Sequence, residues 1–158
     1  GLGFPGGPKI EKLALKSKKY IELPYVVKGM DVSFGGIQTN LKHKFDANNF
    51  SLKDLSYSLQ ETAFAMLVEV SERALAHTGK KELVLGGGVG CNKRLQEMCK
   101  VMCEERGAKF FVPENEYLVD NGAMVAWSGV LMERKWKKDY EIDINPIERT
   151  DDVEVDWI

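Results

Sequence analysis

The chain has 158 residues, of which 44% are hydrophobic and 29% are charged, as in one soluble globular domain. Its 22 basic and 24 acidic side chains give a net charge of -2, which argues against a domain coated in cations for nucleic acid but leaves room for a local basic patch. No run has the length of a membrane span, and the N-terminus lacks the basic and apolar parts of a signal peptide. Three cysteines do not suit a disulfide framework and fit a reducing cytosol.

The first 50 residues predict two short helices separated by an extended stretch. Residues 1–8 are rich in glycine and proline and are expected to be irregular, with Pro8 opening a helix that runs to about Ser17. Residues 20–34 are expected to be extended, with breaks at a proline and a glycine. Residues 35–45 suit a short helix that ends in a loop.

The strongest helix signal spans Ser51 to His77. Ser51 is a suitable N-cap, Asp54 occupies the acid position of a capping box, and Gly79 provides a C-terminal stop. Apolar residues recur at steps of three and four and form one stripe: Leu52, Leu55, Leu59, Ala63, Met66, Val70 and Ala74. This periodicity predicts a long amphipathic helix.

The second half of the chain alternates strands and helices. Residues 82–86 are expected to form a buried strand, followed by a glycine loop and a helix over 92–106 that a glycine ends. Residues 109–113 predict another strand, and 121–136 a final helix before an irregular acidic tail. This order predicts an α/β fold with a mostly parallel sheet, in which ligands bind at the carboxyl ends of the strands.

The loop after the first of these strands is unusually rich in glycine. Its glycines are Gly86, Gly87, Gly88 and Gly90. Neither a P-loop nor a dinucleotide fingerprint matches, because no Gly-Lys-Ser/Thr string exists and the sixth position from Gly86 is Cys91. A plain tight turn is one interpretation, because such turns also recruit glycine. The other is a nucleotide site, where missing side chains let a base or ribose lie on the backbone and the Asn92 amide donates and accepts hydrogen bonds.

Residues 83–95 resemble the adenosine-contacting loop of the actin-like ATPase superfamily, which has a ribonuclease H-like fold. More narrowly, they resemble the tRNA N6-adenosine threonylcarbamoyltransferases, once described as O-sialoglycoprotein endopeptidases and known as the catalytic subunits of the KEOPS complex. Further stretches match in the same order along the chain: residues 4–14, 28–37, 60–77, 117–129 and 149–157. The resemblance implies an α/β, actin-like C-terminal lobe whose N-terminal lobe lies upstream. A start at Gly1 without a methionine also predicts a piece of a longer protein.

The resemblance assigns binding roles to individual residues, although it assigns no catalytic residue. Nucleotide or substrate contacts fall on Gly7, Glu11, Gly87, Gly88 and Asn92. Asp120, in the DNGAM motif, falls on a ligand of one divalent metal, iron or zinc. The two histidine ligands of the family are outside this chain, because His43 and His77 are too far apart and are interpreted as surface residues. From the residues alone, Glu11 is equally well a first-turn acid that complements its helix dipole, and Asp120 a helix N-cap.

The resemblance also implies a reaction and its partners. The parent protein would transfer a threonylcarbamoyl group from threonylcarbamoyl-AMP, made with ATP, to N6 of the adenosine adjacent to the tRNA anticodon. Implied partners are tRNA, the N-terminal lobe, a small kinase-like ATPase and other KEOPS subunits, in the cytoplasm and also in the nucleus if the protein is eukaryotic. Alternatives are an isolated nucleotide-binding or subunit-docking lobe without catalysis, and an ATPase or carbohydrate kinase of the same superfamily. The expected organisation is an inter-lobe segment over 1–26, the C-terminal lobe over 27–140 and an acidic tail over 141–158.

Two further features have ordinary interpretations. Five lysines gather near the N-terminus: Lys9, Lys12, Lys16, Lys18 and Lys19. They are interpreted as a solvated face, with phosphate contacts to tRNA as the more specific alternative. Cys99 and Cys103 are interpreted as packed thiols, because no Cys-x-x-Cys motif exists.

Overall fold

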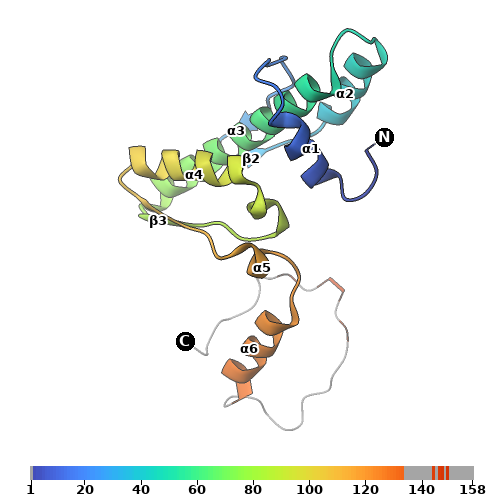
Figure 1. Cartoon of the computed structure of the whole chain (residues 1–158). Helices are drawn as coiled ribbons and strands as arrows, with labels where there is room; N and C mark the ends of the chain where they lie inside the picture. Colours follow the sequence, from blue (N-terminus) through green and yellow to red (C-terminus); the bar gives the residue numbers. More distant parts are fainter. Residues whose placement is uncertain (1, 134–143, 145, 148, 150–158) are drawn as a thin grey trace. The chain divides into compact units, whose positions relative to one another are not determined.

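The structure is a computed structural model that describes residues 2–133, 144, 146, 147 and 149 (Figure 1). The chain divides into two compact units, Gly1–Leu118 and Val119–Ile158, and each is described by itself. The expected division at residues 26 and 140 concerns a lobe outside this chain and stays a prediction. Most of the expected tail, 141–158, lies outside the described residues.

The first unit opens with a helix that begins and ends earlier than expected. Helix α1 spans Gly6–Ala14, so it starts inside the segment expected to be irregular and stops short of Ser17. Pro8 is the third residue of α1, where its missing N–H costs no hydrogen bond because the first backbone N–H groups have no partner within the helix. The backbone N–H groups of Lys16 and Ser17 donate to carbonyls three residues back, which closes the helix in a tighter turn.

The extended stretch and the second helix form as expected. Strands β1 (Val27–Lys28) and β2 (Asp31–Val32) pair as an antiparallel hairpin. Gly29 turns the chain between them with a φ of 62°, a left-handed conformation that glycine adopts without strain. Helix α2 then spans Ile37–Asp46.

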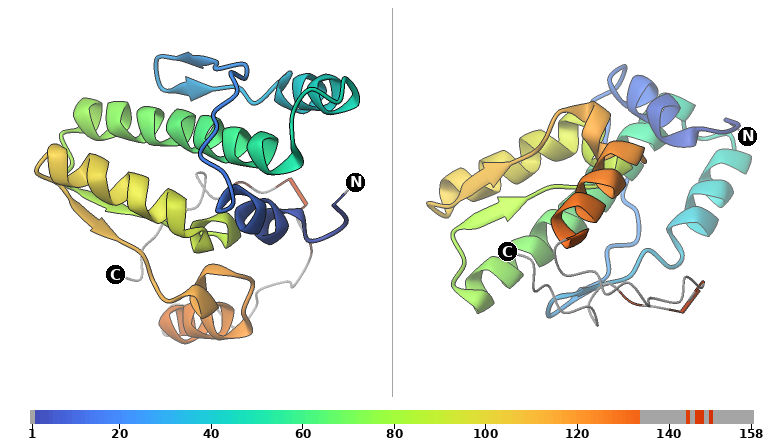
Figure 2. Two further views of the ribbon diagram at one scale, coloured as in Figure 1. Left: turned by 45° about the horizontal axis from the view of Figure 1, so that its top comes forward. Right: turned by 90° about the horizontal axis from the view of Figure 1, so that it is seen from below.

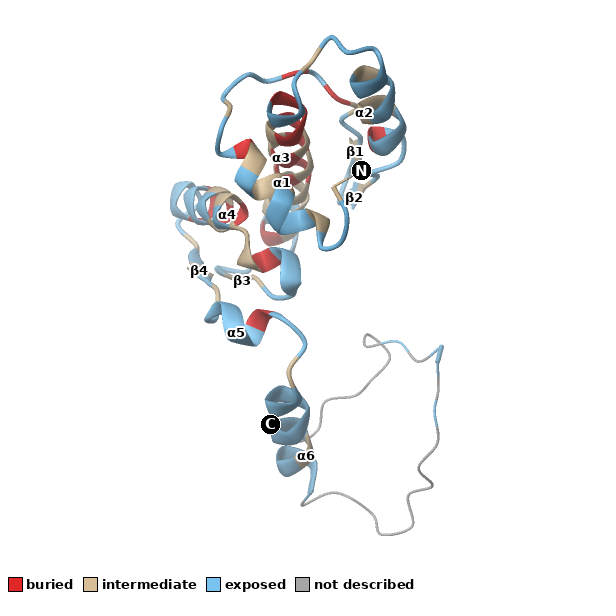
Figure 3. Cartoon of the chain, turned by 45° about the vertical axis from the view of Figure 1, so that its right-hand side comes forward, coloured by how far each residue is buried: buried red, intermediate tan, exposed pale blue. Residues whose placement is uncertain are grey.

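Helix α3, Leu52–Thr78, is the centre of the first unit. Its ends are as predicted: the Ser51 side chain accepts a hydrogen bond from the backbone N–H of Asp54, and Gly79 closes the helix with a φ of 66°. Helices α1, α2 and α4 and the hairpin all contact it, so its buried residues occupy more than one face (Figure 3). The predicted apolar stripe is therefore only part of the buried surface: Leu55 and Met66 are buried, whereas Leu52 at its start is exposed.

A polar stripe on α3, which the apolar periodicity does not predict, fastens the extended segment to the helix. It consists of Asp54, Ser58 and Thr62, all buried and four residues apart. The Ser58 hydroxyl donates to the Asp54 carbonyl (2.7 Å) and accepts from the backbone N–H of Ile21 (2.8 Å). The Thr62 hydroxyl shares a hydrogen bond of 3.0 Å with the Tyr20 hydroxyl. These bonds satisfy polar groups that burial would otherwise leave unpaired.

Asp54 acts differently from the acid of a capping box. Its carboxylate accepts a hydrogen bond from the Ser17 hydroxyl, 2.5 Å away, in the turn that follows α1. Hydrogen bonds from Ser17 and then from Ser51 hold the pKa of Asp54 below its usual value. The residue thus links the turn after α1 to the start of α3.

Ser58→Ala is expected to lower the free energy of unfolding by about 1 kcal/mol, because the buried N–H of Ile21 loses its acceptor. Urea unfolding followed by circular dichroism measures the change. Ser71→Ala is the matched control, since the Ser71 hydroxyl only donates to the Leu67 carbonyl of its own helix. Equal losses in the two variants would show that the Ile21 bond contributes nothing.

The remaining elements of the first unit form a small parallel sheet with helices on one face. Strands β3 (Glu82–Val84) and β4 (Lys109–Phe111) pair in parallel, and α4 (Lys93–Glu105) connects them and runs beside α3 (Figure 2). As predicted, Asn92 precedes α4 and Gly107, with a φ of 62°, follows it. The expectation of a buried strand is wrong for β3, because Val84 is 70% exposed. An apolar run alone does not show whether one or both faces of a strand are covered.

The core of the first unit lies between α3, α4 and this sheet. Its buried residues form two adjoining clusters: Phe64, Leu95 and Cys99, and Leu75, Met102 and Cys103. The interpretation of Cys99 and Cys103 as packed thiols is confirmed. Burial raises the pKa of Cys99 to about 11 and also raises that of Cys103, so both stay protonated at neutral pH.

A short helix that the sequence did not predict, α5 (Asn115–Leu118), ends the first unit. The second unit contains α6 (Gly122–Glu133), which agrees with the predicted final helix as far as residue 133. Residues 134–136 of that prediction lie outside the described residues. Among the helices of the described ranges, none is long and apolar enough to cross a membrane.

Candidate functional site

The glycine loop lies at the carboxyl end of β3, where the fold class predicts a ligand site. Its last residues form a short 3-10 turn, η1 (Gly88–Cys91), that leads into α4. The backbone N–H of Gly90 donates to the Gly87 carbonyl (2.9 Å), and that of Asn92 donates to the Val89 carbonyl (3.0 Å). The Gln96 side chain donates to the Gly90 carbonyl (2.7 Å) and so fixes the loop from one turn inside α4.

The structure explains the four glycines of this loop in different ways. Gly87 has a φ of 86° and a ψ of 162°, a region open almost only to glycine. Gly90 is buried, and a Cβ there would lie 3.3 Å from Cγ of Leu85. Gly86 and Gly88 have no positive φ, and a Cβ on either would meet nothing within 4 Å. A plain tight turn therefore explains two of the four glycines, and the other two leave open space above the backbone.

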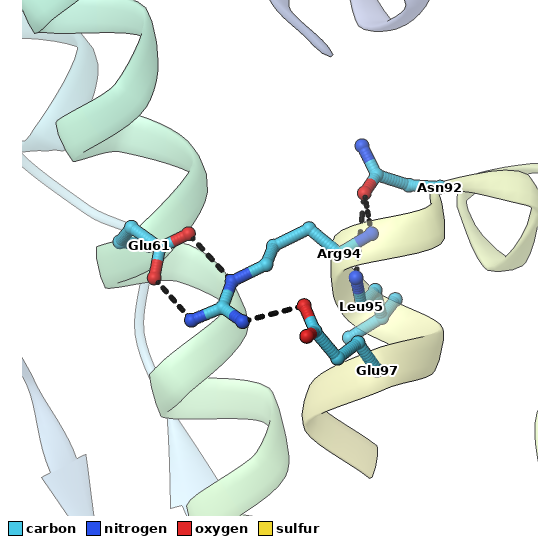
Figure 4. A network of polar contacts seen from close by, with 5 residues as sticks. All are labelled: Glu61, Asn92, Arg94, Leu95 and Glu97. Carbon is cyan, nitrogen blue, oxygen red and sulfur yellow. Dashed lines mark hydrogen bonds and ion pairs between the residues drawn. The ribbon is translucent and has the colours of Figure 1, made fainter. Parts of the chain in front are cut away.

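Asn92 caps α4 and is itself held from α3. Its side-chain Oδ1 accepts hydrogen bonds from the backbone N–H groups of Arg94 (2.9 Å) and Leu95 (3.3 Å) (Figure 4). Its Nδ2 donates to Oε1 of Gln60, which is buried in α3, over 3.0 Å. The expectation that this amide both donates to and accepts from a ligand is therefore wrong on the acceptor side, because both acceptor positions are used within the chain.

Glu11 reaches the same helix end from α1. Its Oε1 accepts a hydrogen bond from the backbone N–H of Lys93, 82 residues further along the chain, over 3.1 Å. Glu11 is the sixth residue of α1, so the alternative of a first-turn acid in its own helix is wrong. Its carboxylate instead complements the N-terminus of α4. Gly7 lies one turn earlier on α1, where a Cβ would meet nothing within 4 Å.

The structure thus brings Glu11 and Asn92 together at the end of the glycine loop, as a shared nucleotide site requires. Their hydrogen bonds take the first three backbone N–H groups of α4, those of Lys93, Arg94 and Leu95. These N–H groups are consequently not available to bind a phosphate. The contacts of each predicted residue with a nucleotide stay predictions.

An ion-pair network ties the first turn of α4 to α3 (Figure 4). The Arg94 guanidinium donates from Nε and Nη2 to the two carboxylate oxygens of Glu61, over 2.9 and 2.8 Å, and from Nη1 to Glu97 over 2.7 Å. These hydrogen bonds, that with Glu61 first, raise the pKa of Arg94. Sequence reasoning missed Glu61 and Gln60, because pairs that join two helices 32 or 33 residues apart leave no local pattern. Gln96 was open to prediction, since it follows Asn92 by one helical turn.

Asp120 belongs to the second unit and its metal role stays a prediction. It is exposed and forms no hydrogen bond or ion pair with the residues that the structure describes. The alternative of an N-cap is wrong, because the backbone N–H of Met124 donates to the Asn121 side chain instead. His43 and His77 are exposed in the last turns of α2 and α3, as expected. Among the described residues, no group of three or more His, Cys, Asp or Glu side chains is placed to hold a metal ion, so these residues alone do not fit one.

Comparison with known proteins gives consistent matches. The family model described as tRNA N6-adenosine threonylcarbamoyltransferase matches residues 1–127. A protein of that name from Thermococcus kodakarensis is 58% identical over 99% of this chain and 49% of its own length. A "probable bifunctional tRNA threonylcarbamoyladenosine biosynthesis protein" from Methanosarcina mazei is 57% identical over 100% of this chain and 29% of its own length. The chain therefore spans about half or less of these curated relatives.

A solved structure shares the fold at low sequence identity. The crystal structure of HypF from T. kodakarensis superposes with a TM-score of 0.63 at 21% identity, over 84% of this chain and 18% of that one. This likeness concerns the fold alone. It agrees with the α/β class expected from the order of strands and helices.

Proposed function

Because this chain belongs to the tRNA N6-adenosine threonylcarbamoyltransferase family, with its actin-like ATPase fold, we propose that it is the nucleotide-binding C-terminal lobe of such a transferase. The protein that contains it moves a threonylcarbamoyl group from threonylcarbamoyl-AMP to N6 of the adenosine adjacent to the tRNA anticodon. The observation that carries the proposal is the glycine loop at the end of β3, open above Gly86 and Gly88.

The geometry favours the adenosine part of a nucleotide over its phosphate. Glu11 places a negative charge beside the loop, which repels a phosphate but accepts hydrogen bonds from ribose hydroxyls. The capped N-terminus of α4 offers no free N–H group from its first three residues. The open backbone at Gly86 and Gly88 suits a flat base or ribose, which binds by close approach to the main chain.

The rest of the reaction requires groups from outside this chain. We propose that Asp120 supplies one carboxylate ligand to a divalent metal, iron or zinc, whose histidine ligands come from outside the chain. Asp120 alone cannot hold this metal, because the described residues contain no other His, Cys, Asp or Glu side chains placed to complete the site. The same proposal includes a tRNA substrate, a kinase-like ATPase and the other KEOPS subunits as partners, and a cytoplasmic location. No observation favours a carbohydrate kinase.

The proposal is tested by calorimetric titration of the chain with AMP. Gly88→Val places a branched side chain in the open space above the loop, so AMP affinity is expected to fall at least about tenfold while the thermal midpoint changes little. The control is Ala76→Val, which places the same branched side chain at an exposed position near the end of α3. Undiminished AMP binding by Gly88→Val, or no binding by the unchanged chain, contradicts a nucleotide site at this loop.

A further inference from the structure

We propose that Gln60 is a positioning residue that locks the Asn92 amide, so that Asn92 offers its ligand a hydrogen-bond donor and never an acceptor. This inference rests on the proposed nucleotide site. It adds the direction of the hydrogen bond between Asn92 and the ligand, with Asn92 as the donor. The ligand atom opposite Asn92 must then be an acceptor, such as a hydroxyl or carbonyl oxygen or an unprotonated ring nitrogen.

The orientation of the Asn92 amide follows from the helix that it caps. The backbone N–H groups of Arg94 and Leu95 both point at one atom of the side chain. A backbone N–H donates only, so that atom is the amide oxygen. The amide nitrogen consequently faces the other way, toward α3.

Gln60 fixes the nitrogen side. The Nδ2 of Asn92 is a donor, so the Gln60 atom 3.0 Å away is its acceptor oxygen, Oε1. Gln60 is only 7% exposed and lies in the first half of α3, the helix that α1, α2, α4 and the hairpin all contact. A buried side chain on a packed helix has little freedom to move, so it holds the Asn92 amide plane in one position.

The Asn92 side chain has only part of its hydrogen-bonding capacity left for a ligand. The two lone-pair positions of Oδ1 are taken by two backbone N–H groups, and one of the two Nδ2 hydrogens is taken by Gln60. The second Nδ2 hydrogen has no partner among the described residues. One N–H donor is therefore the whole polar contribution of the Asn92 side chain to the site.

The decisive variant is Asn92→Asp, titrated with AMP. An aspartate caps a helix as well as asparagine does, and the Gln60 amide can turn to donate to it, so the fold is expected to survive with a nearly unchanged thermal midpoint. The N–H donor is lost, and AMP affinity is expected to fall at least about tenfold. Unchanged AMP affinity in this variant overturns the inference, while the proposed nucleotide site still stands.

A second set of variants tests the lock itself. Gln60→Met keeps the side-chain length but removes the acceptor, and we expect AMP affinity to fall about fivefold. Gln60→Glu restores an acceptor for Asn92 Nδ2, and we expect it to recover most of that affinity. Gln38→Met is the matched control, because it makes the same change at an exposed position of α2. Full AMP affinity in Gln60→Met, or a loss in Gln60→Glu as large as in Gln60→Met, contradicts the lock.

A nucleotide-free measurement separates this inference from the proposed function. The side-chain amide resonances of Asn92 are compared by NMR between the unchanged chain and Gln60→Met. The lock predicts that both resonances shift in Gln60→Met and remain in place in Gln38→Met. If the unchanged chain does not bind AMP, the proposed function fails for this chain, and unshifted Asn92 resonances in Gln60→Met would separately overturn the lock.

Discussion

Leu95→Ala is expected to lower the free energy of unfolding by about 3 kcal/mol. Leu95 is 3% exposed and packs with Phe64 and Cys99 where α3, α4 and the parallel sheet meet. Its truncation removes the hydrophobic transfer energy of three carbons and leaves a cavity that a helix held at both ends cannot close. Urea unfolding measures the loss, and the denaturant slope checks that unfolding remains one transition.

The control for this variant lies on the same helix. Val101 is 47% exposed, so Val101→Ala removes carbons from α4 without opening a cavity and is expected to cost less than about 0.5 kcal/mol. A similar loss in the two variants would mean that the face of α4 carrying Leu95 does not pack against α3. It would also remove the basis for the geometry of the glycine loop, because the backbone N–H of Leu95 is one of the two that orient Asn92.

Much of the fold follows from local signals that the sequence displays directly. Ser51 and Asn92 were predicted as helix starts and Gly79 and Gly107 as helix ends, because caps depend on side chains next to the backbone groups that they satisfy. The glycine loop was predicted for a similar reason, because four glycines between an apolar run and a helix indicate a turn and not a continued strand or helix. Local signals therefore gave the positions of these elements, with end points accurate to a few residues.

The rest depends on contacts between distant segments, which no local pattern encodes. The predicted apolar stripe of α3 does not include Ser58 and Thr62, yet an extended segment about 40 residues earlier buries both side chains. The β3 strand was expected to be buried, but the helices of the first unit cover one face only. In both cases the same hydrophobic pattern is compatible with an exposed and with a buried surface, and tertiary packing decides between them.

The candidate site shows the same division. The resemblance to a family named Glu11 and Asn92, but it did not show that both residues hold the N-terminus of α4. Because these hydrogen bonds form within the chain, the site is organised before any ligand arrives, which lowers the entropy cost of binding. The same bonds limit what the site can offer, since a cap that satisfies a helix cannot also accept from a ligand.

Glu61→Ala is expected to lower the free energy of unfolding by about 2 kcal/mol, the second largest effect. The Glu61 side chain is 15% exposed and binds Arg94 through two parallel hydrogen bonds, the strongest geometry for this pair. Its removal leaves the half-buried guanidinium with a single partner and releases the first turn of α4 from α3. The same unfolding experiment measures the loss at low and at high salt.

Glu97→Ala is the control that separates the two acidic partners of Arg94. The Glu97 side chain is 63% exposed, so its ion pair is solvated and is expected to contribute only a few tenths of a kcal/mol that salt removes. In a double-mutant cycle, the coupling of Arg94 to Glu61 should exceed its coupling to Glu97 and should change little with salt. Equal couplings would place Arg94 in solvent, and α4 would then be held to α3 by apolar packing alone. Nucleotide binding distinguishes the two arrangements as well: if Arg94 anchors the first turn of α4, Glu61→Ala weakens AMP binding because Asn92 moves with that turn, whereas Glu97→Ala leaves it unchanged.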